Sequence, residues 1–194
     1  MRRIRFKFIS SLFLLIVLLA GCSKDPDETL HIIDKSRFEM YWGQNENVSN
    51  IWGQSTSDTI GKPGEKIWVS LNDATYAYYQ FDDYLDAQIF FEDTWYDPFV
   101  NNYEAGDFSG YFYKYFQEGK VKLSTGSGFD KRYTGIVLFN GKFHGNQKNG
   151  DCYGGAYLFD NTVILAYTEH PSSENRSEID AFLNRFDYPA PKER

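Results

Sequence analysis

The chain is poor in cysteine and contains none of the common catalytic motifs. Its 194 residues include two cysteines, Cys22 and Cys152. There is no phosphate-binding glycine loop with its lysine and no Gly-x-Ser-x-Gly turn, and His31, His144 and His170 are not spaced as in zinc proteases. We therefore expect no cofactor and no metal, assign no catalytic residue, and favour a protein that is not an enzyme.

Positive charge is also scarce. The chain has 20 lysines and arginines against 27 acidic residues, which gives a formal net charge of −7. Residues 1–21 hold four of the basic residues and no acidic one, so the remainder of the chain carries −11. Such an acidic body lacks the electrostatic footprint of a nucleic-acid-binding protein, and it is repelled by anionic lipid surfaces. We expect no nucleic-acid partner.

The long apolar run of the chain lies at the N-terminus. Residues 1–7 contain four basic residues, and residues 8–20 are almost wholly apolar. This order is typical of a secretory signal, and the run is too short and wrongly flanked for a transmembrane helix. It ends in Leu19-Ala20-Gly21-Cys22, which closely resembles the cleavage box of bacterial lipoproteins.

The resemblance to lipoproteins implies where the protein resides. In that family the cysteine is alkylated with diacylglycerol, the chain is cut before it, and the new amine is acylated; here this implies a signal peptide over 1–21 and lipidation, including palmitate, at Cys22. Residues 22–28 are short and charged, as in a solvated tether. They also resemble the acidic signal of Bacteroidetes lipoproteins displayed on the outer membrane. We expect an outer-membrane, surface-exposed lipoprotein, with a periplasm-facing location as the alternative and the lipid anchor as its membrane contact.

Two further sites follow from the same context. With Cys22 carrying lipid, Cys152 has no cysteine left to pair with, so no intrachain disulfide is expected. Asp58-Thr59-Ile60 resembles the Bacteroidetes O-glycosylation signal, which makes Thr59 a candidate for glycosylation.

Aromatic residues are abundant, at 19% of the chain. Rings bury a large area each, so they could fill the core; tyrosine and tryptophan also suit a surface that binds sugars or peptides. An apolar-Trp-Gly-Gln unit occurs twice, at Trp42 and at Trp52. Both tryptophans are therefore candidates for ligand-stacking rings, with core packing as the alternative.

Alternating apolar residues predict several strands. Hairpins are expected at 66–81 and 153–168, and a strand at 133–139. The strand at 162–168 is apolar on both faces, which is typical of a central, doubly covered strand. Asn140-Gly141 predicts a hairpin turn.

Two aromatic segments are ambiguous. Residues 84–91 fit either a third strand or a helix capped by Asp82 or Asp83. Aromatic residues within 108–116 recur at helical spacing, which predicts an amphipathic helix there.

The C-terminal part of the chain predicts a closing helix. Ile179, Phe182, Leu183 and Phe186 form an apolar stripe, with Asn175 and Glu178 as a capping pair. We predict an α+β fold, an antiparallel sheet with this amphipathic helix packed on it, as a single domain over 29–188 with a tail over 189–194. In outline the last strands and helix resemble the end of PsbP-like domains; a lipocalin-like barrel with a trailing helix is the alternative.

Function is predicted from composition and from the missing catalytic set. The first hypothesis is a non-catalytic binding domain for a glycan, a peptide or a partner protein. The second is a structural accessory of an envelope complex. The third is a carboxylate-dependent hydrolase, because acids cluster between residues 82 and 97 and glycoside hydrolysis needs two facing carboxyl groups.

Overall fold

The computed structural model describes residues 33–43, 51–55, 64–122, 129–145 and 149–192. For residues 51–55, 120–122 and 129–131 only the backbone is considered. The predicted signal peptide and tether, Cys22 and Thr59 lie outside the described residues.

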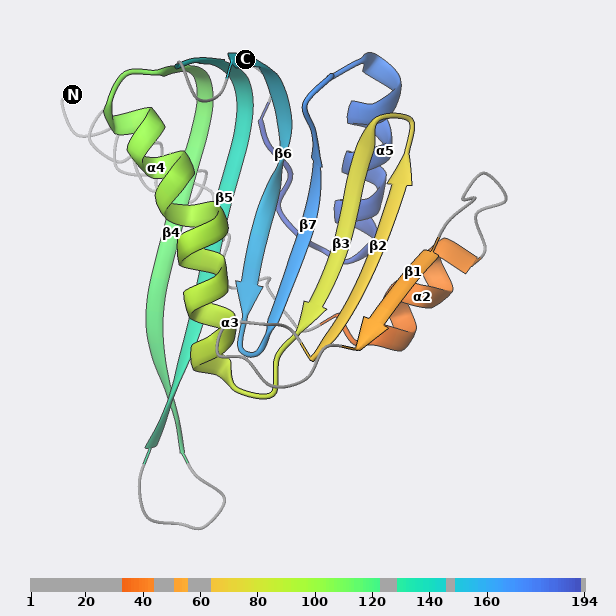
Figure 1. Ribbon diagram of the computed structural model, residues 1–194, viewed down its shortest axis with the longest axis vertical. Helices are drawn as coiled ribbons and strands as arrows, with labels where there is room; N and C mark the ends of the chain where they lie inside the picture. The colour runs from red at the N-terminus through yellow and green to blue at the C-terminus, as the bar shows by residue number, and fades with distance from the viewer. Residues whose placement is uncertain (1–32, 44–50, 56–63, 123–128, 146–148, 193–194) are drawn as a thin grey trace, which may run out of the picture.

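The described strands form an open antiparallel sheet. Its order is β1-β2-β3-β7-β6-β5-β4, so that β1 and β4 lie at opposite edges (Figure 1). The strands are β1 (Ile51–Ser55), β2 (Glu65–Leu71), β3 (Ala74–Gln80), β4 (Phe108–Lys122), β5 (Phe129–His144), β6 (Asn149–Phe159) and β7 (Thr162–Thr168). The α+β prediction is confirmed, and the barrel alternative is wrong because β1 and β4 do not pair.

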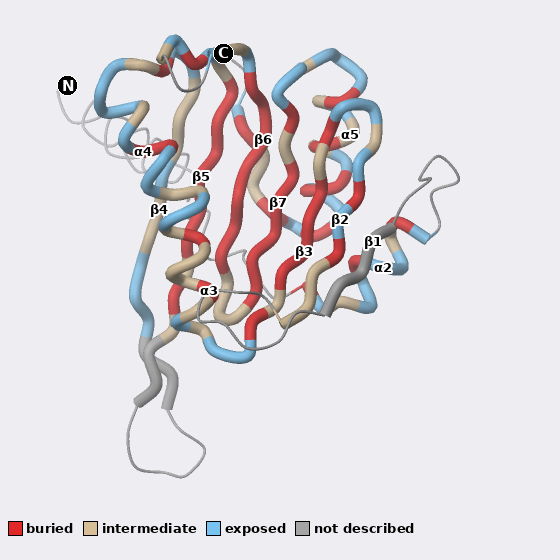
Figure 2. The backbone as a smooth tube through the Cα atoms, viewed as in Figure 1, coloured by how far each residue is buried: buried red, intermediate tan, exposed pale blue. Residues whose placement is uncertain are grey.

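Helices cover both faces of the sheet (Figure 1). The helices are α2 (Lys35–Gly43), α3 (Tyr84–Phe91), the π-helical η2 (Glu92–Tyr96), α4 (Asp97–Glu104) and α5 (Ser173–Arg185). α3, η2 and α4 follow one another without a break on one side, here called the α4 face. α2 and α5 lie on the other side, the α5 face. The strands between them are therefore largely buried (Figure 2).

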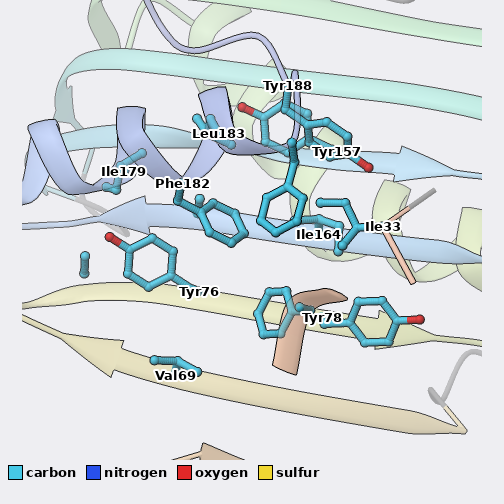
Figure 3. Close-up of a cluster of buried hydrophobic side chains, with 14 of the residues drawn as sticks. Ile33, Val69, Tyr76, Tyr78, Tyr157, Ile164, Ile179, Phe182, Leu183 and Tyr188 are labelled. Carbon is cyan, nitrogen blue, oxygen red and sulfur yellow. The ribbon is translucent and has the colours of Figure 1, made fainter. Parts of the chain in front are cut away.

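The core of the α5 face is built mainly from rings. Phe182 projects from α5 onto Tyr76 of β3, with Ile179 and Leu183 beside it (Figure 3). The three helix residues are 0% exposed, which confirms the predicted apolar stripe. The density of rings compensates for the small number of aliphatic residues, since each ring buries a large area.

The N-terminus of α5 is capped one turn earlier than expected. Ser172 is the N-cap, and its side chain accepts a hydrogen bond from the backbone N–H of Asn175 at 3.2 Å. The Asn175 side chain in turn accepts from the N–H of Ser172 at 2.7 Å, which completes a reciprocal capping box. Asn175 therefore occupies the third helical position of α5, and Glu178 takes no part in the cap.

A second core fills the α4 face. Phe99 of α4 stacks on Phe139 of β5 with ring centroids 4.4 Å apart. In β7, Leu165 belongs to this core while Ile164 belongs to the core of the α5 face. β7 is thus a central strand that is covered on both sides, as its sequence predicted.

The two ambiguous aromatic segments fold in different ways. Residues 84–91 form helix α3, whose N-cap Asp83 accepts from the N–H of Leu85 at 2.6 Å. Residues 108–116, predicted as a helix, belong to strand β4 and pair with β5. The helical prediction failed because spacings of four and eight residues also fit the two-residue period of a strand, and aromatic residues favour strands.

The hairpin turn predicted at Asn140-Gly141 is also absent, because β5 continues through both residues to His144. The Asn140 side chain is committed to tertiary contacts instead of a turn: its Oδ1 accepts from Arg176 Nη1 at 2.8 Å. Gly141 is paired with Gly110 of β4. Contacts with the neighbouring strands and with α5, rather than the local dipeptide, determine the path of the backbone at Asn140-Gly141.

The segment after α5 is docked on the sheet through residue 192. Tyr157 donates from its hydroxyl to the carbonyl oxygen of Pro189 at 2.6 Å, and Asn140 Nδ2 donates to the carbonyl oxygen of Lys192 at 2.9 Å. The expected tail over 189–194 is therefore part of the fold as far as it is described. Buried side-chain donors that need acceptors explain why it is held.

Candidate functional site

The α4 face is covered by helices over only part of the sheet. α3, η2 and α4 make their main contacts with β4, β5, β6 and β7. No described helix lies over β2 and the outer part of β3 on this face (Figure 1). On this side Trp68 and Ser70 of β2 are exposed and Lys66 and Thr75 are half-buried, whereas Ala77 and Tyr79 of β3 are buried.

Trp68 of β2 is the most prominent of these side chains. Ile67 and Val69 point into the core of the α5 face, so Trp68 points to the opposite side, and it is 38% exposed. The Lys66 ammonium lies over its ring at 4.2 Å from the centroid and over the ring of Tyr79 at 5.5 Å. A cation at this distance is attracted to the face of an aromatic ring, so Lys66 helps to hold the faces of both rings toward its ammonium group.

The helical segment supplies the opposite border of this surface. Trp95, in η2, meets the ring of Tyr167 edge-on with centroids 5.0 Å apart, and Phe90 packs on Tyr79 at 4.8 Å. Short π-helical segments inside α-helices occur frequently at functional sites. We call the resulting surface the open aromatic face; its members are Lys66, Trp68, Tyr79, Trp95 and Tyr167.

One polar hollow adjoins the open aromatic face, and a second lies next to the first. The nearer one, of about 230 Å³, is lined by Ser70, Asp73, Thr75, Tyr167, Thr168, Glu169 and His170. The second, of about 520 Å³, is lined by Asn149, Gly150, Asp151, Glu169, His170 and Pro171. Tyr167 belongs to both the aromatic face and the nearer hollow. The aromatic rings are therefore directly next to the hydroxyl and carboxylate groups of that hollow.

The tyrosines of the face are neutral at physiological pH. Burial, with a smaller effect of neighbouring Tyr167, raises the pKa of Tyr79 to about 12. Burial also raises the pKa of Tyr167 above its ordinary value. Among the described members of the aromatic face, Lys66 therefore carries the charge.

The two tryptophans singled out in the sequence differ in what the structure describes of them. Trp42 is 2% exposed and packs on Tyr76 at 4.4 Å between centroids, so it is a core residue of the α5 face rather than a ligand-stacking ring. The Cα atom of Trp52 is paired with that of Trp68 in the β1–β2 register, but the Trp52 side chain lies outside the described part. Trp68 was missed, although the strict alternation of residues 66–71 already indicated that it faces away from Ile67 and Val69.

The acidic cluster at residues 82–97 does not line either hollow. Asp83 caps α3, and Asp82, Asp93 and Asp97 are exposed along the helical segment. Within the described residues no group of three or more His, Cys, Asp and Glu side chains is arranged to hold a metal ion. Cys152 is 1% exposed in the core of the α4 face. These positions offer no pair of carboxyl groups facing each other across a described hollow.

Comparison with protein-family models, with curated proteins and with solved structures finds no match to this chain. None of the described helices is long and apolar enough to cross a bilayer.

Proposed function

We propose that this protein is a lipid-anchored, non-catalytic domain of the bacterial cell envelope that binds a glycan on its open aromatic face. The observation that carries the proposal is the exposed indole of Trp68 on a sheet surface that no described helix covers. Tryptophan is enriched among the residues that dominate binding surfaces, and Trp68 is accompanied by the Lys66 ammonium and by the nearby polar hollow.

The chemistry of the surroundings suits a saccharide. The indole of Trp68 presents a flat apolar face to the C–H groups of a sugar ring, while the adjoining hollow offers hydroxyl groups of Ser70 and Thr75 and the carboxylate of Asp73 for its hydroxyls. The Lys66 ammonium adds a donor beside the ring. Apolar contact together with a few directional polar groups is what orients a small polar ligand.

Replacement of Trp68 by alanine should weaken glycan binding by roughly 5–30-fold, because loss of a central aromatic contact costs about 1–2 kcal/mol. The measurement is affinity electrophoresis and isothermal titration with a panel of soluble polysaccharides, including xylan, mannan, mixed-linkage β-glucan and pectin. Tyr103→Ala is the matched control, since Tyr103 is 44% exposed but stacks on Phe112 at the other edge of the sheet.

The result that supports glycan binding is a saccharide retained by the wild type and by the Tyr103 variant and lost in the Trp68 variant. Retention that is equal in all three proteins would place the site elsewhere. Binding of an unfolded peptide but of no saccharide in the panel would overturn the glycan assignment.

Lipid attachment is tested at Cys22. In a Gram-negative host that is fed an alkyne fatty acid, the wild-type chain should become labelled and sediment with membranes, whereas Cys22→Ser should lose both properties because it removes the acylated thiol. Cys152→Ala is the control, since Cys152 is buried in the folded domain and should leave the label in place. A wild-type chain without label, or a labelled Cys22 variant, contradicts the anchor.

A further inference from the structure

Strand β4 is a long edge without a strand neighbour on its outer side among the described residues. It spans 15 residues and stands last in the order of the sheet. Lys114, Gln117 and Glu118 along it are exposed. An edge strand of this length is a template for pairing with another chain.

The far end of β4 also leaves the body of the protein. β4 and β5 remain paired as far as Lys122 and Phe129, whereas β5 and β6 pair only from Thr134 onward. The described residues 118–122 and 129–133 therefore form a two-stranded arm that extends beyond the rest of the sheet (Figure 1). An isolated two-stranded ribbon is at best marginally stable in water, so a third strand would stabilise this arm.

Charge is distributed unevenly between the arm and the helices of the α4 face. Residues 118–132 contain four basic and two acidic residues in a chain that is acidic overall. Residues 82–107, which include α3, η2 and α4, contain eight acidic residues and no lysine, arginine or histidine. The two segments are thus complementary in charge, and a second copy of the chain offers both.

We propose that two copies of this protein associate through antiparallel pairing of their β4 edges, with Lys114 of each copy opposite Glu118 of the other. In this register Phe116 of one copy lies opposite Phe116 of the second copy, on the two-fold axis. The pairing joins two open sheets into one and gives each arm a third strand, the β4 strand of the second copy.

The same register explains the placement of the charges. A lysine in the middle of an edge strand commonly prevents edge pairing, and a parallel in-register pair would place Lys114 against itself. In the antiparallel register Lys114 instead lies between Glu104 of its own chain, 2.5 Å away, and Glu118 of the second copy. The basic arm of each copy then runs beside residues 110–114 of the other, next to that copy's acidic α4.

The symmetry of the pair has a consequence for binding. A two-fold axis perpendicular to the sheet keeps corresponding faces on the same side, so both open aromatic faces point in one direction and both α2 helices in the other. Two ligand surfaces that point the same way, near the two ends of the joined sheet, bind a long repeating polymer more tightly than one, through effective concentration. The pairing itself does not depend on which ligand is bound.

Register-specific cross-linking tests the dimer. The full chain carrying both Lys114→Cys and Glu118→Cys is expressed, and membranes that contain it are isolated and mildly oxidised. Non-reducing electrophoresis then measures the fraction of disulfide-linked dimer. Directly opposed strand residues have Cβ atoms about 4.5–5.5 Å apart, close enough for a disulfide after small adjustment. The single variants are matched controls. In this register each new cysteine lies four residues along the strand, or roughly 13 Å, from the same cysteine of the second copy.

The expected result is a dimer band at least fivefold stronger in the double variant than in either single variant. A second measurement uses charge reversal: Lys114→Glu should shift the sedimenting species in detergent toward the monomer, and addition of Glu118→Lys should restore the dimer. Restoration isolates the contact between copies, because both variants lack the Lys114–Glu104 pair. Equal cross-linking of single and double variants, or a monomeric wild type, would overturn the proposal.

Discussion

Replacement of Phe182 by alanine is expected to lower the free energy of unfolding by about 3–5 kcal/mol, the range for removal of a buried phenylalanine ring. Phe182 is 0% exposed at the centre of the core of the α5 face. Its ring meets five others, those of Phe38, Tyr41, Trp42, Tyr76 and Phe186. The cavity that alanine leaves cannot close easily, because α5 and β3 are held by all the other contacts of this layer.

The measurement for Phe182 is urea-induced unfolding followed by far-ultraviolet circular dichroism. Leu85→Ala is the control: it also removes a large apolar side chain from a helix, but Leu85 is 48% exposed, and a change within about 0.5 kcal/mol is expected. A Phe182 variant that unfolds at the same urea concentration as the wild type contradicts the described packing.

Replacement of Gly141 by alanine should destabilise the protein by about 3 kcal/mol, at the upper end of the usual cost of overpacking. A Cβ atom at Gly141 would lie 2.2 Å from the carbonyl oxygen of Ser109 and 2.7 Å from the ring of Phe108. The strand backbones approach closely here, since Gly110 is paired with Gly141 and adopts a φ of +140°. Relief of the clash therefore requires β4 and β5 to separate.

The measurement for Gly141 is the midpoint of thermal unfolding. Gly119→Ala, in the same pair of strands, is the matched control, because its Cβ atom would meet nothing closer than the carbonyl oxygen of Arg132 at 3.6 Å. We expect this control to unfold within a few degrees of the wild type. Equal melting of the two alanine variants would show that β4 and β5 do not approach at Gly141 as closely as described.

Structural features that depend on residues within one helix, strand or hairpin could be predicted from the sequence. The stripe from Ile179 to Leu183 identified α5. The alternation within 66–81 placed the hairpin of β2 and β3, in which Asn72 and Asp73 turn the chain with positive φ. The apolar character of both faces of 162–168 indicated a central strand. In each case local periodicity and burial demanded the same conformation.

Patterns that several conformations satisfy could not be resolved in this way. The rings from Phe108 to Phe116 fit a helix or a strand, and pairing with β5 decided for the strand. Asn140-Gly141 is a strong turn signal, but the buried Asn140 amide bonds to Arg176 and to the docked C-terminal segment. Partners that are distant in sequence supplied the deciding free energy, and no local window contains them.

The candidate site was likewise predictable from the sequence only in part. Aromatic density indicated that rings would form either a core or a binding surface, and it could not assign individual tryptophans to one or the other. Trp42 became a core residue because α2 packs on β3, and Trp68 became accessible because no described helix covers β2 on the α4 face.

By itself the sequence determined the fold class, the hairpins at 66–81 and 153–168, the C-terminal helix, and the lack of a recognisable catalytic set. These properties depend on composition and on periods of a few residues. The tertiary structure alone decided that the sheet is open, that β4 is an edge strand, and that Trp68 rather than Trp42 is exposed. Those outcomes depend on which surfaces the helices cover, and coverage is decided by packing between segments that are more than a hundred residues apart in the sequence.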